Sequence, residues 1–398
     1  MRAPQMLLVL SLLSVPALCQ RDLAYDNVVV PQNRIDARDL GYAPVDVIPD
    51  GESGITSLIV APNGDIYGAT SGSRAHLFVL NPRHGYVHPL GVIPDATSLS
   101  NALVVAANGD VYLGTTPAGT LLKYSPHDDD QKSIQIARPL SVTNLGTPIA
   151  GEGIAAMAID RSAHVIYGLT APGAHFFEYS IESGKATDLG VVAEVAPFSE
   201  KFEKDKIMSR MLVVDQQGVV FASGENGSFF RFDPKTQKLE KLGIHAPAVP
   251  GREPWTRVDA FVLDPSGMIY GGTSDGYLFR LDPVRLTVTN LGKALSQYRI
   301  AGLVRLANGD LYGIGGDQDD MARLFRYTPS SGAYDVLGFV DVNRRPYYTW
   351  QAYTIGAMIC GLDGTVYLGE DERISKLYLF FPDDGEQSTD GTTPALRK

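Results

Sequence analysis

Cysteine is scarce in this chain of 398 residues, which contains only Cys19 and Cys360. Cys19 falls within an N-terminal segment that we expect to be removed, so the mature chain would keep a single thiol. A disulfide within that mature chain is therefore excluded, and the fold must be held together by its hydrophobic core. Apolar residues make up 44% of the sequence, which is ample material for a large core.

The sequence also lacks the local motifs of several enzyme classes. It contains no HExxH, no GxSxG, no P-loop, no spaced Cys-His zinc set and no EF-hand loop. The formal net charge of −11 offers no general attraction to nucleic acid. We therefore expect no nucleic-acid partner, no cofactor and no metal. The acidic stretches 315–321 and 369–373 are alternatives for calcium, although solvated charge is the commoner outcome.

Long hydrophobic runs are absent except near the N-terminus. Residues 6–13 are apolar, Arg2 precedes them, and small residues surround Ala17, which is the pattern of a secretory signal peptide over residues 1–19. The run is too short to cross a bilayer, so we expect no transmembrane segment. The prediction is a secreted or periplasmic protein. A lipid anchor on Cys19 is the alternative, but the preceding "PAL" fits a lipoprotein cleavage site poorly.

The opposite end of the sequence is polar. Residues 383–398 contain few large apolar side chains, which predicts a disordered tail. Residues 20–382 therefore remain for the folded domain.

One eight-residue phrase is written repeatedly in that domain: "NGDIYGAT" at 63–70, "NGDVYLGT" at 108–115 and "NGDLYGIG" at 308–315. Each phrase follows an apolar run, and two further strand-like segments come after it, the last ending in Leu-Gly. Asn-Gly tolerates the positive φ that two-residue hairpin turns demand. The aromatic residue of the phrase recurs in seven matching contexts, at Tyr67, Tyr112, Tyr167, Phe221, Tyr270, Tyr312 and Tyr367.

The seventh unit stops at Phe381-Pro382 without a Leu-Gly strand of its own, and the missing strand appears at the other end of the chain, around Leu40-Gly41. A closed ring requires this displacement, because the first strand of the chain then becomes the outermost strand of the last blade. The sequence therefore predicts an all-β fold, a seven-bladed β-propeller of four-stranded blades closed by an N-terminal strand. A pair of β-sandwiches is the alternative, but it would not explain the displaced strand.

The repeat resembles the broad group of propellers that includes streptogramin lyase-like, NHL-like and kelch-like repeats and the propeller polysaccharide lyases. The resemblance covers roughly residues 36–382. Its motifs specify blades and not chemistry. The likeness to polysaccharide lyases implies β-elimination on an acidic polysaccharide as one possible function, without assigning residues to it.

Strand order predicts which loops share a face of the ring. We label the strands of a blade a to d from the axis outward. The short a–b and c–d turns then lie on one face, and the b–c loops and d–a connections lie on the other. Three d–a connections are long and rich in Arg or aromatic residues, at 191–210, 244–257 and 339–354. Function usually resides in such variable loops, so we expect the site there.

Arginine is the side chain that gathers before the innermost strands. Arg257 and Arg299 each stand 13 residues before their anchor aromatic, and Arg210 stands 11 before its own, so all three share one strand face and should converge at the mouth of the ring. Arg holds carboxylate or sulfate by a bidentate fork, and aromatic faces suit sugar rings. The predicted substrate-binding residues are Arg210, Arg257, Arg299, Arg344, Arg345, Trp255, Trp350 and Tyr353.

Two alternatives apply to these residues. Each arginine could instead pair with a neighbouring carboxylate, for example Arg257 with Asp259. Trp255 and Trp350 could instead anchor their loops in the core.

Histidine and tyrosine are the candidate acids and bases. His76 and His175 occupy equivalent positions entering strand c, and His245 lies in a long connection. A neutral imidazole can take or give a proton near pH 7, although a solvated loop histidine is the alternative. The catalytic candidates are His175, His76, His245, Tyr348 and Tyr298.

These residues support three function hypotheses. The first is a secreted, monomeric, carbohydrate-active propeller that cleaves an acidic polysaccharide or oligosaccharide by β-elimination at a uronate, which needs a cation on the carboxylate, a base and an acid. The second is a non-catalytic propeller that binds a glycan, a peptide or an envelope protein. The third, glycoside hydrolysis, needs two carboxylates, and the sequence marks no pair among Glu152, Asp259, Asp317 and Glu370.

Overall fold

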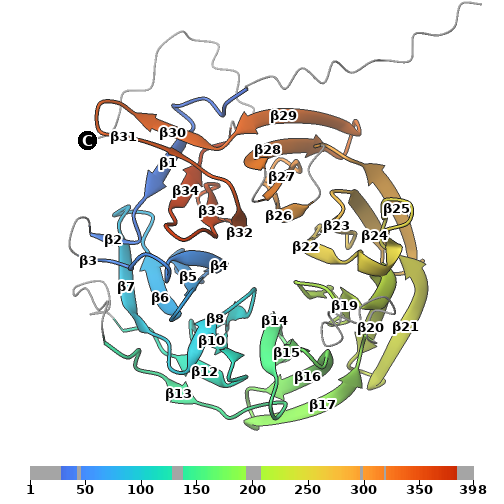
Figure 1. Cartoon of the computed structure of the whole chain (residues 1–398). Helices are drawn as coiled ribbons and strands as arrows, with labels where there is room; N and C mark the ends of the chain where they lie inside the picture. Colours follow the sequence, from blue (N-terminus) through green and yellow to red (C-terminus); the bar gives the residue numbers. More distant parts are fainter. Residues whose placement is uncertain are drawn as a thin grey trace, which may run out of the picture.

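The strands of this protein form seven four-stranded sheets arranged around one axis, as the computed structural model in Figure 1 shows. The structure describes residues 28–42, 46–127, 138–193, 208–295, 299–317 and 320–382. The predicted signal peptide and the predicted polar tail lie outside these ranges. The predicted seven-bladed propeller is confirmed.

The first four blades are built as follows, with the innermost strand named first. Blade 1 contains β4 (Gly54–Val60), β5 (Ile66–Ser71), β6 (His76–Leu80) and β7 (Val87–Val92). Blade 2 contains β9 (Leu103–Val105), β10 (Val111–Gly114), β12 (Leu121–Tyr124) and β13 (Thr143–Asn144). Blade 3 contains β14 (Gly153–Asp160), β15 (Val165–Ala171), β16 (His175–Ser180) and β17 (Lys185–Val191). Blade 4 contains β18 (Val213–Val214), β19 (Val220–Ser223), β20 (Ser228–Asp233) and β21 (Lys238–His245).

The remaining blades repeat the pattern, and the last one borrows its outer strand. Blade 5 contains β22 (Val258–Leu263), β23 (Ile269–Thr273), β24 (Leu278–Asp282) and β25 (Thr287–Gly292). Blade 6 contains β26 (Ile300–Arg305), β27 (Leu311–Asp317), β28 (Asp320–Thr328) and β29 (Ala333–Phe339). Blade 7 contains β32 (Ile355–Cys360), β33 (Val366–Glu370), β34 (Leu377–Phe380) and β1 (Ile35–Arg38).

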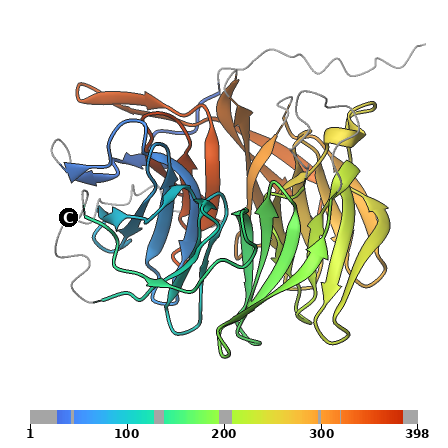
Figure 2. The same cartoon turned by 60° about the horizontal axis from the view of Figure 1, so that its bottom comes forward.

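Small elements decorate this ring. Three two-stranded sheets pair β2 (Gly41–Tyr42) with β3 (Asp46–Val47), β8 (Ala96–Ser98) with β11 (Thr116–Pro117), and β30 (Asp341–Arg344) with β31 (Tyr348–Gln351). Two 3₁₀ turns are η1 (Glu225–Gly227) and η2 (Glu253–Trp255). In Figure 2, η2 and the β30–β31 hairpin rise on one side of the ring, and tight hairpin turns occupy the other.

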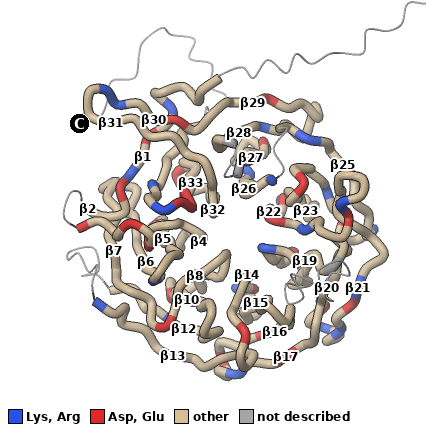
Figure 3. Tube along the Cα trace, viewed as in Figure 1, with Lys and Arg blue, Asp and Glu red and all other residues tan. Residues whose placement is uncertain are grey.

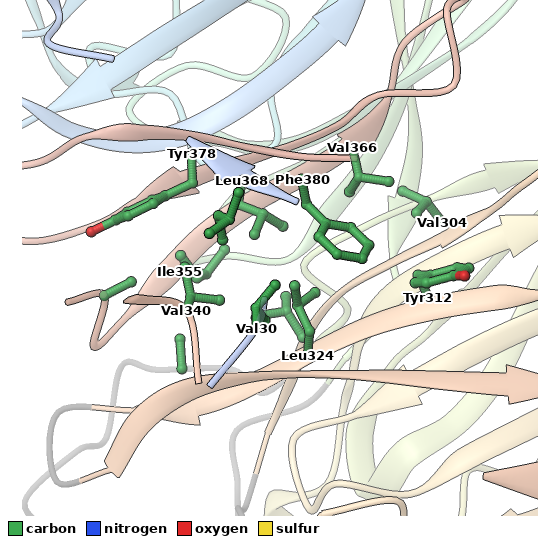
Figure 4. Packing of buried hydrophobic residues seen from close by; sticks show 14 of the residues in the cluster. Val30, Val304, Tyr312, Leu324, Val340, Ile355, Val366, Leu368, Tyr378 and Phe380 are labelled. Atoms are coloured by element: carbon green, nitrogen blue, oxygen red, sulfur yellow. The ribbon is translucent and has the colours of Figure 1, made fainter. Parts of the chain in front are cut away.

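The N-terminal strand closes the circle as the displaced Leu-Gly segment predicts. β1 pairs antiparallel with β34, with Ile35 opposite Phe380 and Arg38 opposite Leu377. Val30, Ile35 and Phe380 are buried in the core that blade 7 shares with blade 6 (Figure 4). The first strand of the chain is thereby fixed to the last, and the ring has no open seam between blades 7 and 1.

The repeated phrase is explained by how neighbouring strands pack. The seven anchor aromatics are all buried, and Tyr167 stacks on Phe176 of its own blade and tilts against Phe232 of the next, with ring centroids 6.0 and 5.8 Å apart. In the "YG" blades the glycine makes room for a phenylalanine of strand c. A Cβ on Gly68 would lie 2.1 Å from the Phe78 ring. The phrase is therefore repeated because it forms the a–b hairpin and the packing between blades.

Candidate functional site

The centre of the mouth face is organised by one buried carboxylate, Asp259 of β22. Its Oδ1 accepts a hydrogen bond from Nε of Arg257 at 2.8 Å, and its Oδ2 accepts one from Nε of Arg299 at 2.8 Å. Arg210 approaches the same carboxylate with Nε 3.9 Å from Oδ1. The structure therefore brings together the three arginines whose spacing predicted convergence. It also shows the expected alternative, since Arg257 does pair with Asp259.

The positions of the three arginines in the chain explain why they meet. Arg257 and Arg299 directly precede β22 and β26, and Arg210 stands shortly before β18, so each lies where the innermost strand of its blade begins. Blades 4, 5 and 6 are neighbours, and the beginnings of their inner strands meet at the axis. Figure 3 shows charged segments at the inner edge of the ring beside β22 and β26.

Positive charge exceeds negative charge in this cluster. Burial raises the pKa of Asp259, but the charges of Arg257, Arg299 and Arg210 lower it further, and the net shift is downward. Desolvation, with repulsion from Arg257 and Arg299, lowers the pKa of Arg210 to about 10. Asp259 therefore stays ionised at neutral pH, and three guanidinium groups remain charged around it. Asp259, even with the neighbouring Asp371, does not offset three cations, so the cluster favours a further anion.

Two of these arginines, Arg210 and Arg257, border a cavity of about 510 Å³ at the axis, which we call the mouth recess. Arg210, Arg257 and Asp371 supply its charged lining. Hydroxyl groups supply most of the remaining polar lining, from Thr56, Ser71, Ser98, Ser100 and Ser209. A recess with guanidinium and hydroxyl groups suits a ligand that carries a carboxylate and several hydroxyls.

Asp371 is a recess residue that the sequence did not single out. It follows β33 in an acidic b–c loop, where the sequence offered only a calcium alternative. Burial raises its pKa, and the opposing effects of a 3.4 Å hydrogen bond from Ser71 and of the charges of Arg299 and Arg210 do not cancel that rise. The recess therefore holds one carboxylate with increased proton affinity beside its arginines. In the sequence, only the position of Asp371 in a b–c loop, ahead of strand c, pointed to the mouth face.

The predicted aromatic residues divide into two groups. Trp350 donates its indole N–H to Glu370 at 2.9 Å, and Lys376 lies over its ring at 4.8 Å, so it anchors its loop as the alternative interpretation expects. Burial raises the pKa of Glu370 to about 7. Trp255 and Tyr353 instead expose 43% of their surface. Trp255 stands two residues before Arg257, and Tyr353 precedes Thr354, whose carbonyl accepts the backbone N–H of Asp371, so both candidates adjoin segments that hold recess residues.

Arg344 and Arg345 do not join the mouth cluster. The connection 339–354 folds into its own hairpin, β30–β31, which Figure 1 shows at the outer edge of the ring beside β1. Arg344 lies 3.6 Å from Asp36 of β1 and bonds the Ile35 carbonyl. Tyr348 pairs with Arg344 across the hairpin. The structure therefore separates Arg344, Arg345 and Tyr348 from Arg210, Arg257 and Arg299.

The candidate histidines also lie apart from the recess. His76 is fully buried, with Nε2 2.7 Å from Glu52, and burial lowers its pKa. It therefore has no surface that could touch a ligand. Nδ1 of His245, at the end of an outer strand, lies 3.3 Å from a backbone carbonyl. Tyr298 lies outside the described residues.

His175 keeps a partly exposed ring between two carboxylates. Its Nδ1 lies 2.9 Å from Asp188 and its Nε2 lies 3.7 Å from Glu152. Glu152 also accepts a short hydrogen bond from Thr170. This ring sits at the start of β16, two strands out from the axis. Among the described residues, no histidine lines the mouth recess.

The described residues lack two further features. The described part of the chain contains no group of three or more His, Cys, Asp or Glu side chains placed to hold a metal ion. It contains no helix long and apolar enough to cross a membrane.

Comparison with known proteins places the chain by fold. No family model matches it, and no curated protein matches it in sequence. A streptogramin B lyase structure is similar over 88% of this chain and 99% of its own length, with a TM-score of 0.63 and 13% identity. The extracellular domain of a putative hybrid two component system from B. thetaiotaomicron matches over 86% of this chain and 39% of its own length, with a TM-score of 0.57 and 15% identity.

A third similar structure, that of U3-55K, covers 88% of this chain and 100% of its own length, with a TM-score of 0.57 and 12% identity. These likenesses confirm the propeller fold that the repeat predicts. At such identities they show the fold alone, and function must be argued from the site.

Proposed function

We propose that this protein binds a carboxylate-bearing, hydroxyl-rich ligand in the mouth recess, with uronate-containing oligosaccharides as the ligand class. The observation that carries the proposal is the buried Asp259, which holds Arg257 and Arg299 by their Nε atoms. The binding mode is the non-catalytic one. A secreted or periplasmic monomer, with the signal peptide expected at residues 1–19, remains part of this proposal.

The geometry of the guanidinium group supports carboxylate binding. Within the described residues, the side-chain hydrogen bonds of Arg257 and Arg299 use Nε alone, so their terminal nitrogens remain as donors. A guanidinium held at one edge is fixed in orientation, and its other edge matches the two oxygens of a carboxylate. Pre-orientation reduces the entropy lost on binding. The site therefore has the donors and the rigidity that recognition of a uronate requires.

The hydroxyl lining supports a sugar in preference to a simple anion. Ser98 and Ser100 lie 3.1 Å apart through their Oγ atoms, and Thr56 donates to the carbonyl of Leu99 at 3.3 Å. Each hydroxyl has both a donor and acceptor capacity, so these groups can exchange partners with the hydroxyls of a sugar ring. Trp255 and Tyr353 are the exposed aromatic candidates for stacking on such a ring.

Calorimetric titration with trigalacturonate tests the proposal. Arg257→Ala and Arg299→Ala should each weaken binding by about tenfold or more, because a charge-assisted hydrogen bond is removed. Arg257→Lys should restore only part of the affinity, since Lys lacks the fork. The matched control is Arg326→Ala, which removes an arginine paired with Asp335 on the outer strands of blade 6. Unchanged affinity in both mouth variants would refute the proposal.

Turnover by β-elimination is the second candidate, and one observation favours it. Asp371 lies in the same recess as Arg210 and Arg257, and its raised pKa suits a proton acceptor. In this scheme the arginines neutralise the uronate carboxylate and Asp371 removes the adjacent proton. As the C=C bond forms, the C–O bond to the leaving sugar breaks, and the leaving oxygen takes a proton from Asp371 or from water. His175 is the remaining histidine candidate for that role.

Absorbance of unsaturated uronate products separates turnover from binding. A rise with the native protein that disappears in Asp371→Asn, while trigalacturonate still binds, would support elimination by Asp371. If the absorbance rise disappears in His175→Ala and persists in Asp371→Asn, His175 is the base instead. No rise over a panel of uronate polymers would leave binding as the function.

A further inference from the structure

A second cavity continues the mouth recess along the axis. It has a volume of about 370 Å³, and the innermost strands of all seven blades line it. We call it the axial channel. Its size lies within the range of small-molecule sites. Its lining is mainly apolar and includes Leu103, Met157, Met211, Phe261, Met358 and Ile359.

Residues that are neighbours in the chain line the two cavities. Thr56 lines the recess and Ser57 the channel, and Arg210 lines the recess and Met211 the channel. Each innermost strand starts at the mouth face and descends toward its a–b turn. A ligand held at the arginines therefore has the opening of the channel directly beneath it.

The two cavities differ mainly in their charged and hydroxyl side chains, although Ser57 and Asn101 also line the channel. The recess has two arginines, an aspartate and hydroxyl groups, whereas the channel walls carry three methionines and aliphatic side chains. Met211, Met358 and Ile359 line the channel and remain partly exposed. The one charged channel residue, Arg305, lies 3.2 Å from Asp264 and is paired. The channel wall thus offers apolar surface that no described residue covers.

We infer that the ligand is amphipathic, with an acidic sugar head in the recess and an apolar tail in the axial channel. This inference rests on the proposed function, because the arginines select the head. A uronate that carries an alkyl, acyl or aryl group satisfies both cavities, whereas a plain oligouronate fills the recess alone. Methionine side chains are flexible and adapt to tails of different shape.

A homologous series of alkyl glucuronides tests the inference by calorimetry below the concentrations at which they aggregate. Affinity should rise about fourfold for each methylene that enters the channel, from the methyl to the hexyl compound. The neutral hexyl glucoside should bind at least about tenfold more weakly than hexyl glucuronide, since it lacks the carboxylate. If the methyl and hexyl glucuronides bind within about twofold of one another, the channel holds only water and the inference is wrong.

Substitutions in the channel wall test the tail assignment directly, and a control substitution outside the channel separates their effect from a general loss of folding. Met211→Gln and Met358→Gln preserve side-chain length but make the wall polar, so the ratio of hexyl to methyl glucuronide affinity should fall toward one. Met268→Gln is the matched control, because Met268 is partly buried but lies outside the channel lining. Equal effects of all three variants on hexyl glucuronide would overturn the tail assignment.

The outcomes distinguish this inference from the proposed function. If affinity requires Arg257 but does not depend on the length of the alkyl tail, the amphipathic-ligand inference is wrong and the proposed binding function stands. No binding of either methyl glucuronide or trigalacturonate would remove the function itself, and the inference with it.

Discussion

The two faces of the propeller use charged and polar side chains in different ways. On the turn face the same arrangement recurs from blade to blade. The amide of Asn63, Asn108 or Asn308 donates to the carboxylate of the aspartate two residues later, at 2.9, 2.9 and 3.3 Å. On the mouth face, the cluster of three arginines around Asp259 occurs once among the described residues. An arrangement that several blades repeat maintains the fold, and an arrangement that occurs once is the better guide to function.

Two carboxyl groups of the mouth face, at Glu370 and Asp371, differ in their pKa values from Asp110 on the turn face. Partial burial raises the pKa of Asp110 on the turn face, but hydrogen bonds from Ser125 and Asn108 and the charge of Lys123 lower it further, so the net shift is downward. On the mouth face, burial dominates at Glu370 and Asp371, and their pKa values rise. The turn face stabilises its carboxylates, whereas the loop after β33 holds two of them at a cost in free energy.

Removal of Asp259 should produce the largest effect. Asp259→Ala leaves Arg257, Arg299 and Arg210 facing one another without their shared carboxylate, so we expect a loss of about 3–5 kcal/mol in the free energy of unfolding. Urea denaturation measures it. Asp335→Ala, which breaks an exposed ion pair with Arg326, should cost less than about 1 kcal/mol. If the two variants lose similar free energy of unfolding, Asp259 contributes no more to stability than an exposed ion pair does.

The pH dependence of stability should identify Glu370. Its pKa is about 7 in the folded protein and near 4.5 in the unfolded chain, so the folded state binds the proton more tightly. Stability should therefore fall as pH rises from about 4.5 through 7, by about 2 kcal/mol between pH 5 and pH 8.

The matched variant for this test is Glu370→Gln, which keeps the acceptor for Trp350 and removes the titration. Subtracting its urea midpoints at the two pH values from those of the native protein isolates the contribution of Glu370. If the two proteins lose the same stability over this pH range, Glu370 does not titrate there.

The repeat made the fold predictable, because a phrase that must form a hairpin and accept a neighbouring phenylalanine leaves a periodic signal. The displaced strand at Leu40 predicted the closure, and strand parity predicted the meeting of Arg210, Arg257 and Arg299. Long connections gave no such signal. Residues 339–354 form a separate hairpin that takes Arg344 away from the axis, a path that depends on contacts with Gln32 and Asp36.

Burial of single side chains was equally hard to predict. His76 and His175 occupy equivalent positions in the repeat, yet His76 is closed in and contacts Glu52 from the preceding d–a connection, whereas His175 stays partly exposed. Asp371 was missed for a related reason, since its raised pKa depends on burial by residues distant in the sequence. Spacing places a residue on a face of the ring, but only the folded loops decide what covers it.

The smallest predicted effect compares two glycines with the same backbone strain on opposite faces. Gly109 has φ +90° in a repeated a–b turn, Gly251 has φ +85° in the connection before Arg257, and an added Cβ would meet no atom within 4 Å at either position. Replacement by Ala should cost about 1 kcal/mol in each case, from the left-handed conformation alone. Trigalacturonate affinity should fall a few-fold in Gly251→Ala only, because relaxation of that connection moves Arg257. Equal weakening by Gly109→Ala would mean that the turn face contributes to binding, and the division between the two faces would fail.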